Sequence, residues 1–135
     1  MKKFDHYRAN LAVLSQADRQ NLENEFITGG IIDKFAIQFE LGWKVLKHLL
    51  QYEGRSEARS GSPREILKTA FQVYDFIDED VWIAMLNDRN SMSHVYDGNA
   101  ANRLAQTIIS LYIPTFQKLE RKIVERYPKI DSLLI

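Results

Sequence analysis

The stretch IIDKFAIQFELGWKVLKHLL, residues 31–50, carries apolar side chains at the three- and four-residue intervals of an α-helix. The apolar positions form one wide stripe: Ile31, Ile32, Phe35, Ala36, Phe39, Trp43, Leu46, Leu49 and Leu50. A stripe of this width must be covered on more than one side. The stretch is therefore predicted to be the central helix of a bundle, and Gly54 is expected to end it.

A first amphipathic helix is predicted before the central one. Its apolar face consists of Phe4, Tyr7, Leu11, Leu14 and Ala17, and the helix is expected to run to about Asn24. Gly29 and Gly30 are expected to break the chain between the two helices, because glycine weakens a helix interior.

Two helix starts follow the central helix. Residues 54–62 are rich in Arg, Ser, Glu and Gly and predict a solvated loop. Residues 62–65, Ser-Pro-Arg-Glu, combine an N-cap, a proline at the first helical position and a capping-box glutamate. The face expected to be buried consists of Ile66, Leu67, Ala70 and Phe71. Asp78 is predicted to cap the next helix, which is expected to end near His94, before the turn signal at residues 97–99.

A long last helix is predicted after Asn99, with a kink at Pro114 and a stop at Pro128. No segment alternates as a strand would. We therefore expect an all-α fold: an up-and-down bundle of four main helices plus a short helix, in one domain over residues 1–135. The apolar tail, residues 130–135, either folds back on the bundle or meets a partner.

Composition excludes several classes of protein. The 18 basic and 18 acidic side chains balance, so no global field attracts duplex DNA or an anionic membrane. The chain has no cysteine, which excludes thiolate metal sites and thiol nucleophiles. His6 and His48 have no companions at ligand spacing, so neither a metal site nor a cofactor is predicted. We expect a cytoplasmic protein, because neither a signal peptide nor an apolar run long enough to span a bilayer is present.

Residues 88–97, Asp-Arg-Asn-Ser-Met-Ser-His-Val-Tyr-Asp, hold the densest chemistry in the chain. Arg89 is a fixed cation, and His94 can carry a proton near neutral pH. On an ideal helix the two side chains would point about 140° apart. They converge only if the helix unwinds there or if a second copy supplies the missing group.

Three blocks of this sequence resemble the HEPN superfamily. They are residues 39–44 (Phe-Glu-Leu-Gly-Trp-Lys), 62–67 (Ser-Pro-Arg-Glu-Ile-Leu) and 89–97 (Arg-Asn-Ser-Met-Ser-His-Val-Tyr-Asp). The branch that the chain is most similar to comprises nucleotidyltransferase substrate-binding proteins related to the HepT toxins. Gly42 stands where these relatives more often carry alanine.

The resemblance implies a helical homodimer that works with a cognate minimal nucleotidyltransferase in a toxin–antitoxin-like pair. It also implies metal-independent cleavage of single-stranded RNA, in which Arg89 binds the scissile phosphate and His94 moves the proton. Asn90 and Ser93 are the candidate substrate-binding residues. Tyr96 would be the site at which the partner adenylylates the protein and silences it.

The chemistry of RNA cleavage independently favours a dimer. Attack by the 2′-hydroxyl needs a base on the nucleophile and an acid on the departing oxygen, on opposite sides of phosphorus. One motif supplies one histidine. A two-fold axis through the motif would bring a second Arg89 and a second His94 to the same phosphate.

Simpler interpretations remain open for the same residues. Arg89 and His94 are also what a helix C-terminus favours for its dipole, and Tyr96 could be a half-buried surface phenol. Glu40 and Lys44 are four residues apart, which predicts an exposed ion pair, and the apolar stripes predict core positions for Phe39, Trp43 and Trp82. The alternative to a ribonuclease is a non-catalytic substrate-binding or docking subunit of the nucleotidyltransferase.

Overall fold

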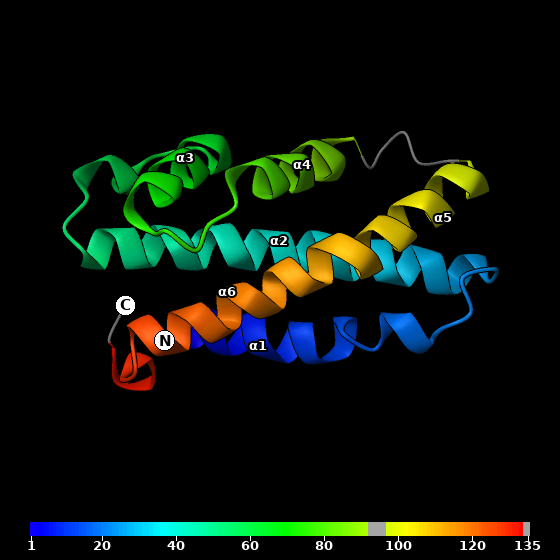
Figure 1. The fold of residues 1–135 in the computed structure, drawn as a ribbon, viewed down its shortest axis with the longest axis horizontal. Helices are drawn as coiled ribbons and strands as arrows, with labels where there is room; N and C mark the ends of the chain where they lie inside the picture. Colours follow the sequence, from blue (N-terminus) through cyan, green and yellow to red (C-terminus); the bar gives the residue numbers. More distant parts are fainter. Residues whose placement is uncertain (92–96, 134–135) are drawn as a thin grey trace.

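The computed structural model describes residues 1–91 and 97–133, and within those ranges the chain contains helices and no strand. The predicted all-α bundle is confirmed (Figure 1). The α-helices are α1 (Lys2–Leu14), α2 (Glu25–Tyr52), α3 (Pro63–Val73), α4 (Glu79–Asn90), α5 (Gly98–Thr107) and α6 (Ile113–Arg126). A π-helical segment, η4 (Ile108–Tyr112), joins α5 to α6, and short 3-10 helices lie at Ala17–Arg19 (η1), Ser56–Arg59 (η2) and Ile130–Ser132 (η5).

The chain makes four passes, alternately up and down, along the long axis of the molecule (Figure 1). α1 and α2 are the first two legs, and α5, η4 and α6 together form the fourth. The third leg consists of two short helices, α3 and α4, in agreement with the two helix starts predicted at Ser62 and Asp78. Both pack against α2, so α2 is the central helix that its apolar stripe predicts.

The boundary between the first two helices was predicted wrongly. α1 ends at Leu14, and α2 begins at Glu25 and continues through Gly29 and Gly30. The Asn24 side chain caps α2 by accepting a hydrogen bond from the Phe26 amide at 2.9 Å. Burial of Thr28, Ile31 and Ile32 around the glycine pair offsets the glycines' cost of roughly 1 kcal/mol each.

The predicted helix starts at Ser62 and Asp78 are confirmed. The Ser62 hydroxyl accepts from the Glu65 amide, and the Asp78 carboxylate accepts from the Val81 amide, both at 3.3 Å. Phe71 is wrongly placed by the prediction, since its position on α3 faces away from α2 and leaves it 49% exposed. The loop before α3 contains η2, whose Ala58 is fully buried and accepts a hydrogen bond from the Gln51 side chain at 3.0 Å.

The end of α4 also differs from its prediction. The helix stops at Asn90, and the Ser91 amide closes it by donating to the carbonyls of Asn87 and Asp88. Gly54, with a φ of 82°, follows the end of α2, and Tyr127 caps α6 just before Pro128, so the stops predicted at Gly54 and Pro128 are confirmed.

The last leg contains a π-helical segment close to the proline at which a kink was predicted. η4 ends two residues before Pro114, which lies in the first turn of α6, where its missing N–H costs little. A π segment turns the side chains that follow it relative to a regular helix. In this chain it directs Tyr112 inward against Phe35, with ring centroids 5.2 Å apart.

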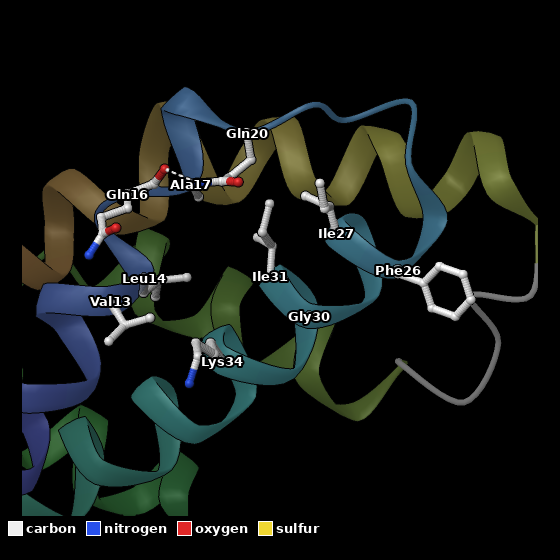
Figure 2. Close-up of a pocket in the computed structure, with 10 residues that line it drawn as sticks. All are labelled: Val13, Leu14, Gln16, Ala17, Gln20, Phe26, Ile27, Gly30, Ile31 and Lys34. Atoms are coloured by element: carbon white, nitrogen blue, oxygen red, sulfur yellow. Dashed lines mark hydrogen bonds between the residues drawn. The ribbon is translucent and has the colours of Figure 1, made fainter.

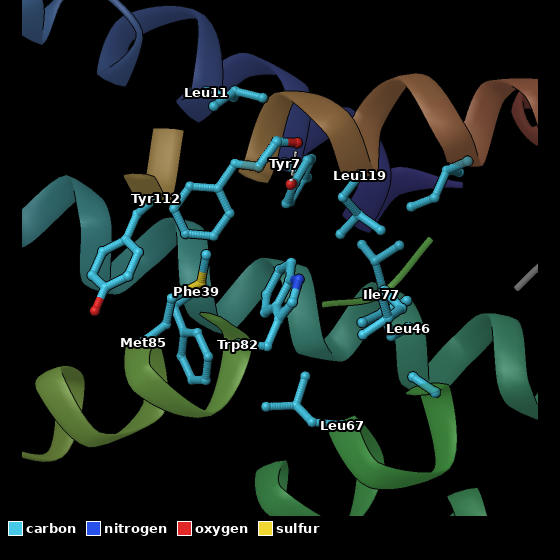
Figure 3. Close-up of a cluster of buried hydrophobic side chains, with 14 of the residues drawn as sticks. Tyr7, Leu11, Phe39, Leu46, Leu67, Ile77, Trp82, Met85, Tyr112 and Leu119 are labelled. Atoms are coloured by element: carbon cyan, nitrogen blue, oxygen red, sulfur yellow. Dashed lines mark hydrogen bonds between the residues drawn. The ribbon is translucent and has the colours of Figure 1, made fainter. Parts of the chain in front are cut away.

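The core is centred on Trp82, which α4 inserts between α2 and α6 (Figure 3). Its indole packs against Phe39 and Phe116, with ring centroids 6.1 and 5.6 Å away. Trp82 and Phe39 are core residues as predicted. Trp43 is only partly buried, because it lies at the edge of α2 beside Glu40.

The two ends of the chain meet at one end of the bundle (Figure 1). The Met1 amino group donates to the Ile130 carbonyl at 3.3 Å, and Ile130 is buried. The tail up to Leu133 therefore folds back on the bundle, while residues 134–135 lie outside the described range. No helix among the described residues is both long and apolar enough to cross a membrane.

Candidate functional site at the end of helix α4

Arg89 lies in the last turn of α4 and is held by a carboxylate from α2. Its guanidinium forms an ion pair with Glu40, and the two side chains are 35% and 27% exposed. The remaining solvent access lets a phosphate approach the arginine from outside. Because this ion pair joins two partly buried side chains on different helices, it also holds the end of α4 in place against α2.

Glu40 contacts three side chains, those of Arg89, Trp43 and Lys44, and these four residues form a cluster. Its carboxylate accepts a hydrogen bond from the Trp43 indole at 3.1 Å, and the Lys44 ammonium lies 3.7 Å away. The predicted Glu40–Lys44 pair is thus present, but it is one part of a larger arrangement in which one carboxylate serves two cations. Glu40, Arg89 and Lys44 together leave one net positive charge.

Asn90 touches the other side of the guanidinium. The Arg89 Nη1 donates to the Asn90 side-chain oxygen at 3.1 Å, and Asn90 itself is exposed. Asn90 therefore orients Arg89, and its exposed amide can also reach a ligand bound there. Both groups fit a site for an anion with several oxygens, because the fork of arginine matches phosphate geometry.

Asp88 ties the same helix end to the last leg of the bundle. The Tyr112 hydroxyl donates a hydrogen bond to the Asp88 carboxylate. Burial raises the pKa of Tyr112, and the bond to Asp88 and its negative charge raise that pKa further. Tyr112 itself is only 2% exposed, and its ring faces Phe35.

The structure places part of the predicted site. Arg89 and Asn90 are together at the end of α4. Ser93, His94 and Tyr96 lie outside the described residues, so their meeting with Arg89 stays a prediction. Asp97, where the description resumes, caps α5 by accepting from the Asn99 amide at 2.9 Å.

Sequence reasoning missed two partners of this helix end. Glu40 belongs to the first of the three blocks that carry the family resemblance, so its place in that block was a usable signal. Tyr112 had no such signal, because the π segment that turns it toward Asp88 has no residue pattern that distinguishes it from a regular helix.

A separate hollow of about 240 Å³ lies between the end of α1, η1 and the first turns of α2 (Figure 2). Its lining is mostly apolar, with Leu14, Ile27 and Ile31 on its walls and Lys34 at its rim. Neither Arg89 nor Asn90 lines it. It is therefore a feature of the α1–α2 junction, distinct from the cluster around Arg89.

Comparison with known families identifies the chain. No curated protein matches it. A family model described as nucleotidyltransferase substrate binding protein like matches residues 2–125, which include every element from α1 to nearly the end of α6. The matched range includes the Glu40–Arg89 cluster and the motif that follows it. The chain belongs to the nucleotidyltransferase substrate binding protein like family.

Proposed function

We propose that the protein is a HEPN-type partner of a minimal nucleotidyltransferase and a metal-independent ribonuclease that the partner silences. The observation that carries this proposal is the position of Arg89. It is partly exposed at the end of α4, directly before the segment that bears His94 and Tyr96. Family membership supports the nucleotidyltransferase as partner.

The proposed reaction cleaves single-stranded RNA through its own 2′-hydroxyl. One His94 removes the proton of that hydroxyl, and the oxygen attacks phosphorus while the bond to the 5′-oxygen breaks. A second His94, from the other copy in a homodimer, protonates the departing 5′-oxygen. Arg89 binds the non-bridging oxygens as charge builds on them, and Asn90 and Ser93 hold the phosphate in place. The products are a 2′,3′-cyclic phosphate and a free 5′-hydroxyl.

Glu40 limits when Arg89 can act. A phosphate must replace part of the Glu40 contact to gain both arms of the guanidinium. The ion pair therefore keeps the arginine oriented, with its positive charge balanced by Glu40, until an anion that binds arginine more strongly arrives. This gives the site selectivity for phosphates over weaker anions.

Silencing is proposed to occur at Tyr96. Its phenol oxygen would attack the α-phosphorus of ATP in the active site of the partner, forming a tyrosyl-AMP bond and releasing pyrophosphate. The added phosphate is an anion two residues from His94. It would compete with RNA for Arg89 and so block the site.

The ribonuclease is tested with purified protein and labelled single-stranded RNA in excess chelator. We expect cleavage by the wild type and none by His94→Ala, with equal helix content in both by circular dichroism. Inert wild-type protein with its fold intact would contradict the enzyme proposal.

Adenylylation is tested separately by mass spectrometry after incubation with the cognate transferase and ATP. The wild type should gain the mass of one adenylyl group for each modified chain, and Tyr96→Phe should gain none. Equal labelling of Tyr96→Phe would contradict the assignment.

A second candidate is a non-catalytic subunit that docks the nucleotidyltransferase and presents its substrate. The engagement of Arg89 by Glu40 favours it, because a paired arginine is also a structural tie between two helices. It predicts that Arg89→Ala lowers stability and transferase binding while RNA stays uncleaved by any variant.

A further inference from the structure

The C-terminal half of α2 carries basic side chains and no acidic ones. Residues 41–52 include Lys44, Lys47 and His48 but neither aspartate nor glutamate, although the chain as a whole balances 18 basic and 18 acidic side chains. The three basic residues are three and four positions apart, so they share one face of the helix. The core positions in the same turns lie elsewhere around α2: Val45, Leu46, Leu49 and Leu50.

Lys3 of α1 adds a further positive charge to this face. α1 packs against α2 along its length. Burial lowers the pKa of His48, and the positive charges of Lys3 and Lys47 lower that pKa further, so both ammonium groups act on the imidazole. Among the residues that the structure describes, neither lysine forms a salt bridge. We call Lys3, Lys44, Lys47 and His48 the basic tract.

The basic tract begins at the cluster around Arg89. Lys44 lies 3.7 Å from Glu40, and Glu40 is paired with Arg89. Lys47 and His48 follow about one helical turn after Lys44, which is roughly 5 Å further along the axis of α2. A polyanion that places one phosphate on Arg89 can therefore place its next phosphates on the tract.

The basic tract ends at a hollow of about 270 Å³, where α6 ends beside α2 (Figure 1). Tyr52, about one turn after His48, lines this hollow together with Arg126 and Lys129. Tyr52 is 53% exposed, and its ring meets the Tyr127 ring edge-on, with centroids 6.1 Å apart. Proteins that bind single-stranded nucleic acids combine a positive groove with aromatic side chains on which bases stack. The tract and the hollow supply both.

Acidic side chains are concentrated at a different place. Asp75, Asp78, Glu79 and Asp80 line a separate hollow at the junction of α3 and α4. The balanced net charge of the chain thus hides a separation of charge over the surface. Such a separation repels a polyanion from the α3–α4 junction and attracts it to the basic tract.

We propose that the basic tract binds the phosphates of single-stranded RNA beyond the cleavage site, and that Tyr52 stacks on one of its bases. This inference rests on the proposed function, because it takes the phosphate at Arg89 as the point of cleavage. Glu40 and Tyr52 are about 18 Å apart along α2, so the strand is longer than a dinucleotide. Contacts with phosphates and stacked rings tolerate many base sequences.

The test is RNA binding measured by fluorescence anisotropy across a salt series, with a labelled oligouridine of about 12 nucleotides. The His94→Ala background and excess chelator keep the RNA intact. Lys3→Gln and Lys47→Gln should each weaken binding about three- to tenfold at low salt. Each should also reduce the slope of log affinity against log salt by about 0.7, the value for one phosphate contact on a single strand.

Lys122→Gln is the matched control, because it removes one positive charge from α6. That helix packs on the opposite side of α2, where its Phe116 lies against the buried Phe35. The affinity and the salt slope should both stay unchanged in this variant. Helix content by circular dichroism confirms that every variant is folded.

Two further measurements follow the strand along the tract. Tyr52→Ala should weaken binding about fivefold or more, whereas Tyr52→Phe, which keeps the ring, should bind as the wild type does. In a titration followed by NMR, the oligouridine should raise the pKa of His48, because its phosphates oppose the charges of Lys3 and Lys47.

Unchanged affinity and salt slope in folded Lys3→Gln and Lys47→Gln would overturn the inference. Equal losses in Lys122→Gln, an unmoved His48 pKa, or binding to anionic lipid vesicles without binding to oligouridine would also overturn it. The proposed function fails in a different way: wild-type protein that binds RNA along the tract and cuts none rejects the ribonuclease alone. Cleavage of long RNA that is indifferent to Lys3 and Lys47 rejects the tract alone.

Discussion

At the scale of single residues, Gly42 is set by its contact with Trp82. A Cβ at Gly42 would lie 2.9 Å from the Trp82 ring and 3.3 Å from the Tyr7 ring. Both aromatic side chains are buried, and Trp82 is wedged between Phe39 and Phe116, so neither can move cheaply. This position therefore requires glycine for close packing and not for backbone freedom.

Gly42→Ala should destabilise the protein by about 1 kcal/mol. Its helix-propensity gain, up to about 1 kcal/mol, is smaller than an overpacking cost of about 1–3 kcal/mol. Gly29→Ala is the control: it lies in the same helix with open space around it and should stabilise by roughly 0.5–1 kcal/mol. Urea unfolding measures both. Equal stabilisation by the two substitutions would contradict this account, because it would show that the Trp82 ring moves aside for the added methyl group at little cost.

Glu40 competes with phosphate for Arg89, so its neutralisation should tighten RNA binding. A partly exposed ion pair is worth about 0.5–1 kcal/mol. In the His94→Ala background, Glu40→Gln should therefore raise the affinity for single-stranded RNA about two- to fivefold, as measured by fluorescence anisotropy. Glu57→Gln, in the exposed pair with Arg55, removes the same charge elsewhere and should have little effect. Weaker binding by Glu40→Gln would mean that the carboxylate orients Arg89 more than it blocks it.

At the scale of elements, the caps of the helices were predictable and some of their ends were not. Ser62 and Asp78 satisfy amides within three residues, so the pattern that predicts them is local. α2 continues through Gly29 and Gly30 because of side chains that it buries against other elements. α4 stops at Asn90 beside anchors on α2 and η4. Such long-range contacts have no signature in the neighbouring sequence.

The bond between Tyr112 and Asp88 should stabilise the end of α4. Tyr112→Phe is expected to lower the free energy of unfolding by about 1–2 kcal/mol, because it leaves a partly buried carboxylate without its donor. It should also speed amide exchange in the last turn of α4. Tyr52→Phe, at a tyrosine that is 53% exposed, is the control and should change neither quantity. An unchanged rate of amide exchange in Tyr112→Phe would show that the ion pair between Glu40 and Arg89 alone holds the last turn of α4 in place.

At the scale of the whole molecule, the bundle could be predicted from apolar spacing, whereas the site could not. Helical periodicity follows from residues close in sequence. Glu40 and Arg89 are far apart in the chain, and only the packing of α4 on α2 brings them together. The resemblance supplied Arg89 and Asn90 as candidates. It did not show that the Glu40 carboxylate forms an ion pair with Arg89.

Buried phenols should make the fold sensitive to alkali. Burial raises the pKa values of Tyr7, Tyr74, Tyr112 and Tyr127, so the folded protein keeps protons that the unfolded chain releases near pH 10. The stability contributed by these groups is therefore complete below pH 10 and is lost as the pH rises above it.

Phenolate absorbance and circular dichroism followed together should show these tyrosines ionising only as the helices unfold. Reversible ionisation of all four near pH 10 with full helix content would contradict their burial.

The most direct test of the central claim is analysis of the RNA ends produced by wild-type protein and Arg89→Ala in chelator. We predict a 2′,3′-cyclic phosphate from the wild type, and its absence from folded Arg89→Ala. Cleavage of equal rate and product by Arg89→Ala, or no cleavage by the folded wild type, would contradict a phosphate site at the end of α4.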